Sequence, residues 1–325
     1  MRRNTDLGAG AGAATGMTLV GTMAAVSATV TAYPVLIGQA LRYGVAAAVL
    51  LPLAARAAGA PPKGAREWAL LVALAASGLA GFNYCLVEAV RTASPATVGA
   101  VLGCAPLVIS VAGPLVQGRR PSRRLVGAAL TVSAGAALAS GFGGGGLRGL
   151  AYAVGALTGE VLFSLLAVPL LPRLGAVRLS AYSVALAVPL LAAAALVSGE
   201  SFRAPTPAEG AALAYIGLVI TVVAFLLWYR ALGRLGADRA APYGGLIAVS
   251  AAATTAVIGA GVPSAAEIAG CLLVAVGVTC AAIPPGGPFT LRRPAERDVR
   301  GMRWPISYTP SCFRWGRTPR RNTGS

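Results

Sequence analysis

The sequence predicts an all-α polytopic membrane protein with ten transmembrane helices, arranged as two inverted repeats of five helices. Its 325 residues are 56% apolar and only 11% charged, whereas ordinary soluble domains contain about 25% charged residues. The charged residues fall in short clusters, and the apolar runs between them are roughly 20 residues long. A helix of that length crosses the roughly 30 Å hydrocarbon core of a bilayer, because it rises 1.5 Å per residue.

The ten predicted spans follow one another with short polar connections. They are centred near Met23, Ala46, Ser77, Ala105, Ser133, Glu160, Ala187, Val219, Ala248 and Leu273. Glycine, proline and charge mark the connections, among them RAAGAPPKGARE (56–67), QGRRPSRR (117–124), GFGGGGLRG (141–149), PRLGAVR (172–178), SGESFRAPTPAEG (198–210), RALGRLGADR (230–239) and GAGVPSAAE (259–267). The first run follows a cytoplasmic N-terminus (1–15) and is too long for the apolar core of a signal peptide, so we interpret it as an uncleaved span.

The distribution of basic residues predicts the topology. With the N-terminus in the cytoplasm, the external loops contain only Arg91, Arg148 and Arg203. The internal loops contain Arg56, Lys63, Arg66, Arg119, Arg120, Arg123, Arg124, Arg173, Arg178, Arg230, Arg234 and Arg239. This bias follows the positive-inside rule and predicts a multi-pass protein of the cytoplasmic (plasma) membrane with both termini cytoplasmic. It also accounts for the net charge of +17 without a nucleic-acid partner, because no folded basic face with interleaved aromatic residues is present.

The two halves of the sequence, residues 16–141 and 149–283, resemble each other. EAVRTASPATVGAVLG (88–103) parallels RALGRLGADRAAPYGGLI (230–247). Matching loops nevertheless carry opposite charge bias: GRRPSRR (118–124) is strongly basic, and its counterpart GAGVPSAAE (259–267) has no basic residue. An odd number of spans per repeat gives the repeats opposite orientations, which is the architecture of alternating-access carriers with a site near the midplane.

Several of these segments resemble the drug/metabolite transporter superfamily, in its EamA-type ten-helix branch. The resemblance covers about residues 17–283 and is carried by QALRYGVAAAVLLPLAAR (39–56), LAYIGLVITVVAFLLWYRALGRLGADRAA (213–241) and the span with Pro106. It implies a carrier, often an exporter, that moves small metabolites or drugs through a central cavity. The sequence departs from the family at Gly118-Arg119, where Gly-Glu is frequent, and at Ile247-Ala248-Val249, where a proline is expected.

Glu160 is the leading candidate for the transport chemistry. It lies about eleven residues from either end of its apolar run, on a helical face with Tyr152, Gly159, Ser164 and other small residues. A carboxylate inside a span costs about 2.5 to 3.5 kcal/mol on insertion scales, and desolvation favours its protonated form. We expect Glu160 to couple transport to protons or to pair with a cationic substrate. The alternative is a protonated glutamate that only holds helices together.

Two further charged residues are transport-pathway candidates. Glu88 shares a stripe with Ser77 and Tyr84 in the third span, with a solvated position at the outer mouth as the alternative. Arg42 lies in the outer half of the second span, where it can partner Glu88 or Glu160, attract an anionic substrate group, or extend to the lipid headgroups.

The predicted cavity lining consists of Asn83, Tyr84, Tyr152, Ser164 and Phe225. Trp228 and Tyr229 adjoin Arg230 and are predicted to form an interfacial aromatic belt, whereas Phe225 lies one turn deeper. Pro106 is predicted to kink the fourth span.

The remaining features exclude or leave open other classes of protein. The chain has no histidine, and its five cysteines have no zinc-ligand spacing, so we expect no metal, no cofactor and no enzymatic activity. No phosphate-binding loop is present, so energy would come from gradients. The expected function is a secondary transporter that exports a small metabolite or drug across the cytoplasmic membrane by alternating access, with proton coupling through Glu160 as one option. The alternatives are an uncoupled facilitator and, less favoured, a membrane scaffold, a receptor or a membrane-embedded enzyme. The expected partners are a small-molecule substrate and membrane lipid, with the protein a monomer or a homodimer.

Residues 284–325 form a basic, proline-rich tail that is predicted to be disordered and cytoplasmic.

Overall fold

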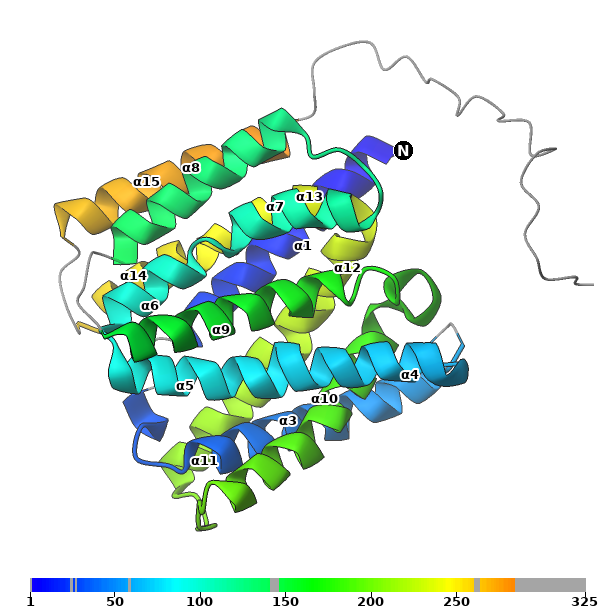
Figure 1. Cartoon of the computed structure of the whole chain (residues 1–325), viewed down its shortest axis with the longest axis vertical. Coiled ribbons are helices and arrows are strands. Elements are labelled where there is room, and N and C mark those ends of the chain that lie inside the picture. Colours follow the sequence, from blue (N-terminus) through cyan, green and yellow to red (C-terminus); the bar gives the residue numbers. More distant parts are fainter. Residues whose placement is uncertain are drawn as a thin grey trace, which may run out of the picture. The chain divides into compact units, whose positions relative to one another are not determined.

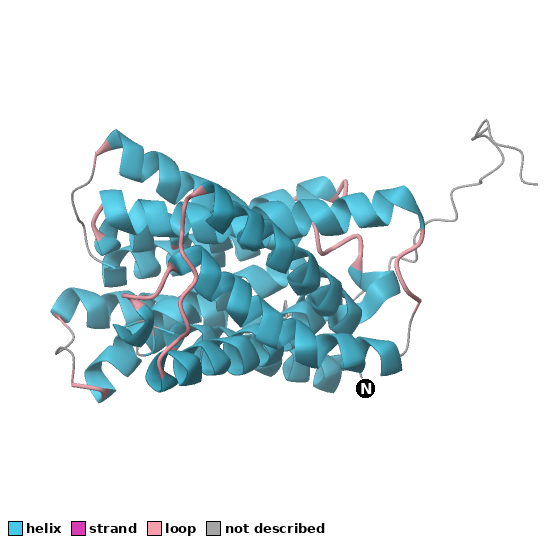
Figure 2. Ribbon diagram, turned by 90° about the horizontal axis from the view of Figure 1, so that it is seen from below, coloured by secondary structure: helices cyan, strands magenta, loops and turns pink. Residues whose placement is uncertain are grey.

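The computed structural model describes residues 2–23, 26, 28–57, 60–140, 146–259 and 264–283. Within these residues the protein is all-helical and contains no strand (Figure 2). The all-α prediction is therefore confirmed for the part of the chain that the structure describes. The predicted tail, residues 284–325, lies outside it.

The helices of the first half fall into five consecutive segments. They are α1 (Arg2–Gly21); α3 (Val35–Arg56), preceded by the short η1 (Ala28–Val30); a continuous run of α4 (Gly64–Ala73), η2 (Leu74–Gly81) and α5 (Phe82–Thr92); α6 (Pro95–Leu102) with α7 (Ala105–Val116); and α8 (Arg123–Ser140).

The helices of the second half also fall into five consecutive segments. Its segments are α9 (Leu147–Leu165); α10 (Leu171–Val197); a continuous run of α11 (Pro207–Tyr215), η3 (Ile216–Val223) and α12 (Ala224–Leu235); a run of α13 (Ala237–Ala240), η4 (Ala241–Gly245) and α14 (Leu246–Val257); and α15 (Ala265–Ala282). Figure 1 shows the long helices running roughly alongside one another.

Seven helical segments of the described residues are long and apolar enough to cross a membrane. The ten-span prediction also includes α1, α8 and α9. These three helices contain charged residues that lower their mean hydropathy. They are Asp6 in α1, Arg123 and Arg124 in α8, and Arg148 and Glu160 in α9. The chain is thus a multi-pass membrane protein.

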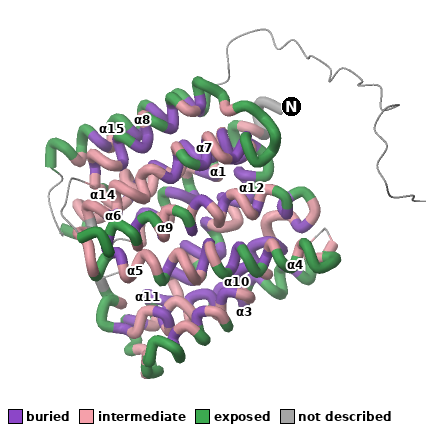
Figure 3. The backbone as a smooth tube through the Cα atoms, in the orientation of Figure 1, coloured by how far each residue is buried: buried purple, intermediate pink, exposed green. Residues whose placement is uncertain are grey.

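The outer faces of the spans are apolar. In α15 the mean hydropathy is 2.0, yet only 22% of its residues are buried. Leu272 and Val276, for example, are 63% and 55% exposed. Figure 3 shows exposed and partly exposed residues along the outer edges of the bundle. Such faces suit contact with lipid tails.

Small residues bring α8 and α15 together. A Cβ atom added to Gly270 would lie 2.4 Å from the backbone nitrogen of Ala139, and one added to Gly135 would lie 2.7 Å from the carbonyl oxygen of Gly270. Backbones this close are typical of helix association in lipid, where small side chains permit tight packing in place of a hydrophobic driving force.

The helical elements recur at a constant interval. Adding 142 to the bounds of η2 (74 and 81) gives those of η3 (216 and 223), and adding 142 to the bounds of α8 (123 and 140) gives those of α15 (265 and 282). The packing follows the same rule: α1 contacts α12 and α14, and α9 contacts α5 and α7, while α3 pairs with α10 and α8 pairs with α15.

Both η2 and η3 are π-helical segments of eight residues within long spans. In η3 the Thr221 hydroxyl donates to the carbonyl oxygen of Ile216, five residues earlier, at 3.0 Å. π-Helical turns are rare and occur frequently at functional sites. The two segments therefore direct attention to the residues that face them.

Candidate functional site

Glu160 lies on the buried face of α9. Ala153 and Ala156, at seven and four residues before it, are fully buried, and Ser164, four residues after it, is 2% exposed. Residues at these spacings share a helical face, yet Glu160 itself is partly exposed. No hydrogen bond or ion pair joins it to another described residue.

Two flanking contacts orient this face. On one side, a Cβ atom added to Gly159 would lie 2.8 Å from the Ser77 carbonyl oxygen, so α9 touches the backbone of η2. On the other side, a Cβ atom added to Gly113 of α7 would lie 3.7 Å from the Leu165 side chain. On the buried face of α9, Glu160 lies between the contact with η2 and the contact with α7. Its side chain therefore points into the bundle.

The depth of Glu160 differs from the sequence expectation. The helix ends at Leu165, five residues after Glu160, so the carboxylate lies about 7.5 Å along the axis from that end and not at the middle. The apolar residues that follow, 166–170, form the connection to α10. Ala167 and Leu170 of this connection are buried, which is why its sequence resembles a continued span.

An aromatic cluster adjoins this part of the bundle. The Phe163 ring lies 4.9 Å from Phe225 and 5.0 Å from Tyr229, between ring centroids. Phe225 thus packs beside the face that carries Glu160. Phe163 could not be selected from the sequence, because its contacts on α12 are distant along the chain.

The predicted aromatic belt at Trp228 and Tyr229 is wrong. Trp228 is 5% exposed and Tyr229 is fully buried, whereas a belt residue would be open to lipid and water. The neighbouring Arg230 is exposed, and α12 continues to Leu235. The basic neighbour therefore indicated neither the end of the helix nor the direction of these rings.

Arg42 belongs to a second polar cluster, between α3 and η3. It is 6% exposed. Its Nε donates to the Thr221 hydroxyl at 2.8 Å, its Nη1 donates to Gln39 Oε1 at 3.0 Å, and its guanidinium lies 5.0 Å from the centroid of the Tyr43 ring. Arg42 therefore does not reach the lipid headgroups, and it forms no ion pair with Glu88 or Glu160.

Asn83 continues this cluster into α5. Its amide nitrogen donates to the Tyr43 hydroxyl at 3.0 Å and to the Leu79 carbonyl oxygen of η2 at 2.7 Å, and the residue is 3% exposed. The sequence selected Arg42 and Asn83, but Tyr43, Gln39 and Thr221 were missed because neutral residues give no charge signal.

Glu88, Tyr84 and Tyr152 lie together toward the ends of α5 and α9 that are predicted to be external. Arg91, whose side chain is 60% exposed, donates to Glu88 at 2.8 Å. The Tyr84 and Tyr152 rings meet edge-on with centroids 6.2 Å apart, and Tyr84 is 41% exposed. The structure does not join these three residues to Glu160 or Arg42.

Pro106 stands just after an interruption in the fourth predicted span. α6 ends at Leu102, α7 begins at Ala105, and Gly103 and Cys104 form a turn between them. Proline fits the first turn of a helix because its missing N–H would be unpaired there. The bend thus lies at the residues that precede Pro106.

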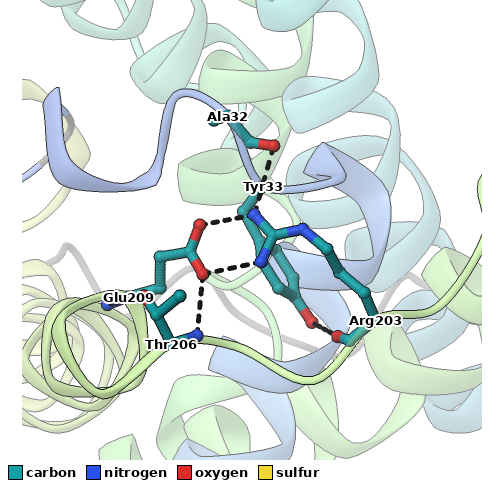
Figure 4. Close-up of polar contacts among 5 residues, drawn as sticks. All are labelled: Ala32, Tyr33, Arg203, Thr206 and Glu209. Atoms are coloured by element: carbon teal, nitrogen blue, oxygen red, sulfur yellow. Dashed lines mark hydrogen bonds and ion pairs between the residues drawn. The ribbon is translucent and has the colours of Figure 1, made fainter.

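An ion-pair network joins the connection between α10 and α11 to the start of α3 (Figure 4). Arg203 contacts both carboxylate oxygens of Glu209, one at 2.8 Å, and stacks 4.7 Å from the centroid of the Tyr33 ring. Tyr33 donates its hydroxyl to the Arg203 carbonyl oxygen at 2.7 Å. The hydrogen bond to Glu209 raises the pKa of Arg203. We call this network the Arg203 tether.

A second network occupies the corresponding place at the other end of the bundle. Arg173, in the short turn that begins α10, donates to the carboxylate of Glu67 and, at 3.0 Å, to the Pro61 carbonyl oxygen. Glu67 and Glu209 are 142 residues apart. We call this network the Arg173 tether. The α4 and α11 segments that carry the two glutamates lie at opposite ends of the bundle in Figure 1.

Comparisons with known proteins agree with this architecture. The family model described as "EamA-like transporter family" matches residues 7–141 and 147–283. The protein named "Uncharacterized transporter YetK" of Bacillus subtilis (strain 168) is 27% identical over 265 residues, which cover 78% of this chain and 80% of that protein. A solved structure described as "Crystal structure of protein" superimposes with a TM-score of 0.71 and 23% identity, over 84% of this chain and 97% of the other. That likeness shows the fold alone.

Proposed function

The chain belongs to the EamA-like transporter family and is a membrane transporter, and we propose that it is a secondary transporter that exports a small metabolite or drug across the cytoplasmic membrane. The proposed cycle is alternating access, coupled to protons through Glu160. The observation that carries the proposal is a carboxylate on the most buried face of α9 with no partner among the described residues.

The proposed architecture is two inverted repeats of five spans. It is supported by the constant interval of 142 residues between matching elements and by the matched packing of α1 and α9. The family model also matches two successive ranges. Because each repeat has an odd number of spans, the loop charges invert between repeats, as the positive-inside rule requires.

Glu160 supplies the proposed coupling. An ionised carboxylate without a partner is costly inside a bundle, so the side chain favours the protonated state when water is excluded and the ionised state when water reaches it. If the two sides of the membrane gain access to Glu160 in turn, each cycle moves one proton against one substrate molecule. The short distance from Glu160 to the end of α9 gives the proton a short path to the predicted cytoplasmic side.

The two tethers support alternating access. The Arg203 tether and the Arg173 tether hold equivalent elements of the two proposed repeats, at opposite ends of the bundle. Both are ion pairs at partly exposed positions, with Arg side chains 41% and 33% exposed, and such pairs contribute only about 0.2 to 1 kcal/mol each. We propose that one tether opens at a time, because weak contacts of this kind can break without a large cost.

The test uses everted membrane vesicles that contain the wild type or Glu160→Gln. They are energised with a proton gradient and offered a panel of amino acids, nucleosides and cationic dyes. Substrate uptake and substrate-dependent collapse of the gradient are measured together. We expect both signals in the wild type and neither in Glu160→Gln.

Two further variants calibrate this assay. Glu267→Gln changes a carboxylate that only caps α15, by accepting from the Ser264 backbone N–H at 2.6 Å, so it should transport like the wild type. Glu88→Gln tests the predicted pathway role of Glu88. Uptake without gradient collapse, unchanged in Glu160→Gln, would contradict proton coupling and make the protein a facilitator.

A further inference from the structure

We propose that Arg42 binds a carboxylate group of the transported substrate, so that the cargo belongs to the class of small organic acids and other carboxylate-bearing metabolites. This inference rests on the proposed transport function and specifies the substrate class of that site. It follows from the burial of Arg42, from its neutral partners and from the donors that remain free around it.

The charge of Arg42 is buried without an anionic partner among the described residues, and the Tyr43 ring, whose centroid lies 5.0 Å from the guanidinium, compensates only part of it. Its guanidinium is protonated under all physiological conditions, and the residue is 6% exposed. The two groups that it contacts by hydrogen bonds, Thr221 and Gln39, are neutral. A buried charge is costly unless it is paired, so an anion must account for the retention of this side chain inside a span.

The carboxylates of the described residues do not supply that anion, because none of them lies within 4.0 Å of the Arg42 nitrogens. Asp6, Glu67, Glu88, Glu209 and Asp238 pair with other arginines. Glu200 accepts from the backbone N–H groups of Leu36 and Ile37, and Glu267 caps α15. Glu160 has no cationic partner of its own.

The donors that remain fit a carboxylate. Nε and one N–H of Nη1 are used, which leaves three of the five guanidinium N–H groups without an acceptor among the described residues. Two N–H groups of one guanidinium match both oxygens of a carboxylate. The Tyr43 hydroxyl accepts from Asn83 at 3.0 Å, and its own hydrogen likewise finds no acceptor in the described part of the chain.

The neighbours hold Arg42 in place for this task. Thr221 is fully buried and is itself anchored to Ile216 in η3, so the guanidinium is held through Nε by Thr221 and through Nη1 by Gln39, which leaves Nη2 unused. A residue that is positioned in advance loses less conformational freedom when a ligand binds. The π-helical segment is thus part of the proposed carboxylate site.

Arg178 shows how a structural arginine differs. It is 9% exposed and donates at 2.9 Å to the carbonyl oxygen of Ala57, the residue that caps the C-terminus of α3. The C-terminus of a helix carries partial negative charge, so Arg178 has a compensating partner within the protein. Arg42 lies seven residues after the start of α3 and lacks such a partner.

The test measures binding directly, with the full-length protein in lipid nanodiscs. Matched pairs of carboxylic acids and their primary amides serve as probes: phenylacetate and phenylacetamide, lactate and lactamide, and phenylalanine and phenylalaninamide. Ligand-induced shifts of the unfolding temperature give an apparent Kd for each probe. We expect at least one acid to bind at least tenfold more tightly than its amide.

Three variants complete the experiment. Arg42→Gln should abolish the preference for the acid, and Arg42→Lys should retain part of it, because a lysine keeps the charge but not the fork of donors. Arg178→Gln should leave it unchanged. A preference that survives in Arg42→Gln, or no preference in any wild-type pair, overturns the proposal. The binding assay and the vesicle assay can give different outcomes. If the protein binds the probes as expected but fails the vesicle assay, proton-coupled transport is rejected and the carboxylate site is still supported.

Discussion

At the scale of single residues, the buried contact between Asn83 and Tyr43 is open to a direct test. Asn83→Leu removes the donor to the Tyr43 hydroxyl and to the Leu79 carbonyl oxygen. Hydrogen bonds between membrane helices contribute about 0.6 to 1.7 kcal/mol, so we expect a loss of that size in unfolding free energy, measured by denaturation in detergent. In a double-mutant cycle with Tyr43→Phe, the two losses should not add. Strict additivity would show that the contact has no energetic effect.

The charged and amide residues of the interior could be chosen from the sequence, but their partners could not. Glu160, Arg42 and Asn83 stood out because polar side chains are rare in apolar runs. Thr221 lies 179 residues from Arg42, so the sequence gave no sign of their contact. Tyr229 was placed at the interface because of Arg230, although the two side chains of one helix face different surroundings. The burial of these polar residues was therefore easier to predict than their contacts.

At the scale of helices, a close approach fixes α9 against η2 and α5. A Cβ atom added to Gly159 would lie 2.8 Å from the Ser77 carbonyl oxygen and 2.9 Å from Phe82. Gly159→Val should therefore separate the helices, lower the unfolding temperature and reduce transport, since Glu160 is the next residue. Overpacking of this kind costs about 1 to 3 kcal/mol. Thermal unfolding and vesicle uptake check both effects.

Gly44 provides the matched control for this substitution. It also lies inside a span, in α3, but a Cβ atom added there would meet nothing within 4 Å. Gly44→Ala should stabilise the protein by up to about 1 kcal/mol, because alanine favours helix more than glycine does. If Gly159→Val and Gly44→Ala changed stability alike, close packing would not be the reason for Gly159.

The Arg203 tether yields a prediction for the α11 segment. Glu209 both caps this helix, with the Thr206 backbone N–H donating to it at 2.8 Å, and binds Arg203. Glu209→Gln removes the charge that pairs with Arg203 and weakens the cap. We expect faster hydrogen–deuterium exchange at residues 32–37 and 200–206, because the tether connects these segments.

Glu267→Gln separates the two roles of Glu209. Glu267 forms the same capping box with Ser264, at the start of α15, and has no arginine partner in the described residues. Its substitution should affect exchange only in the first turn of α15. Equal effects of the two substitutions beyond the capped turn would rule out the tether.

The order of the helices was largely predictable, and their irregularities were not. Loop composition and charge indicated where spans begin and end, and the recurrence of the halves followed from short matching segments. The π-helical turns in η2 and η3 have no such signal, because IGLVITVV (216–223) is as apolar as any straight helix. The same is true of residues 166–170, whose apolar side chains suit both a span and a buried turn. Hydropathy reports burial in lipid or protein but not backbone geometry.

At the scale of the whole molecule, the interval of 142 residues relates features that would otherwise be separate. Glu67 and Glu209 occupy equivalent places near the starts of the two long spans that contain π-helical segments, and each binds an arginine. Arg42 has no counterpart, since residue 184 is a valine, and Glu160 corresponds to Thr18. In the proposed repeat, the helices of the two halves correspond, whereas the interior residues Arg42 and Glu160 have no charged counterpart in the other half. This asymmetry is expected of a single asymmetric ligand bound between two similar halves.

The proposed inverted arrangement predicts that the connections before the two equivalent spans face opposite sides of the membrane. Arg66 and Ser201 are both exposed and lie beside Glu67 and in the connection before Glu209. In a background without native cysteines, Arg66→Cys and Ser201→Cys should react with a membrane-impermeant maleimide from opposite sides. Intact cells should label only Ser201→Cys, and everted vesicles only Arg66→Cys, because the basic loop at 56–67 is expected in the cytoplasm. Labelling of both variants from one side would require the repeats to be parallel, and it would remove the basis for assigning the two tethers to opposite gates.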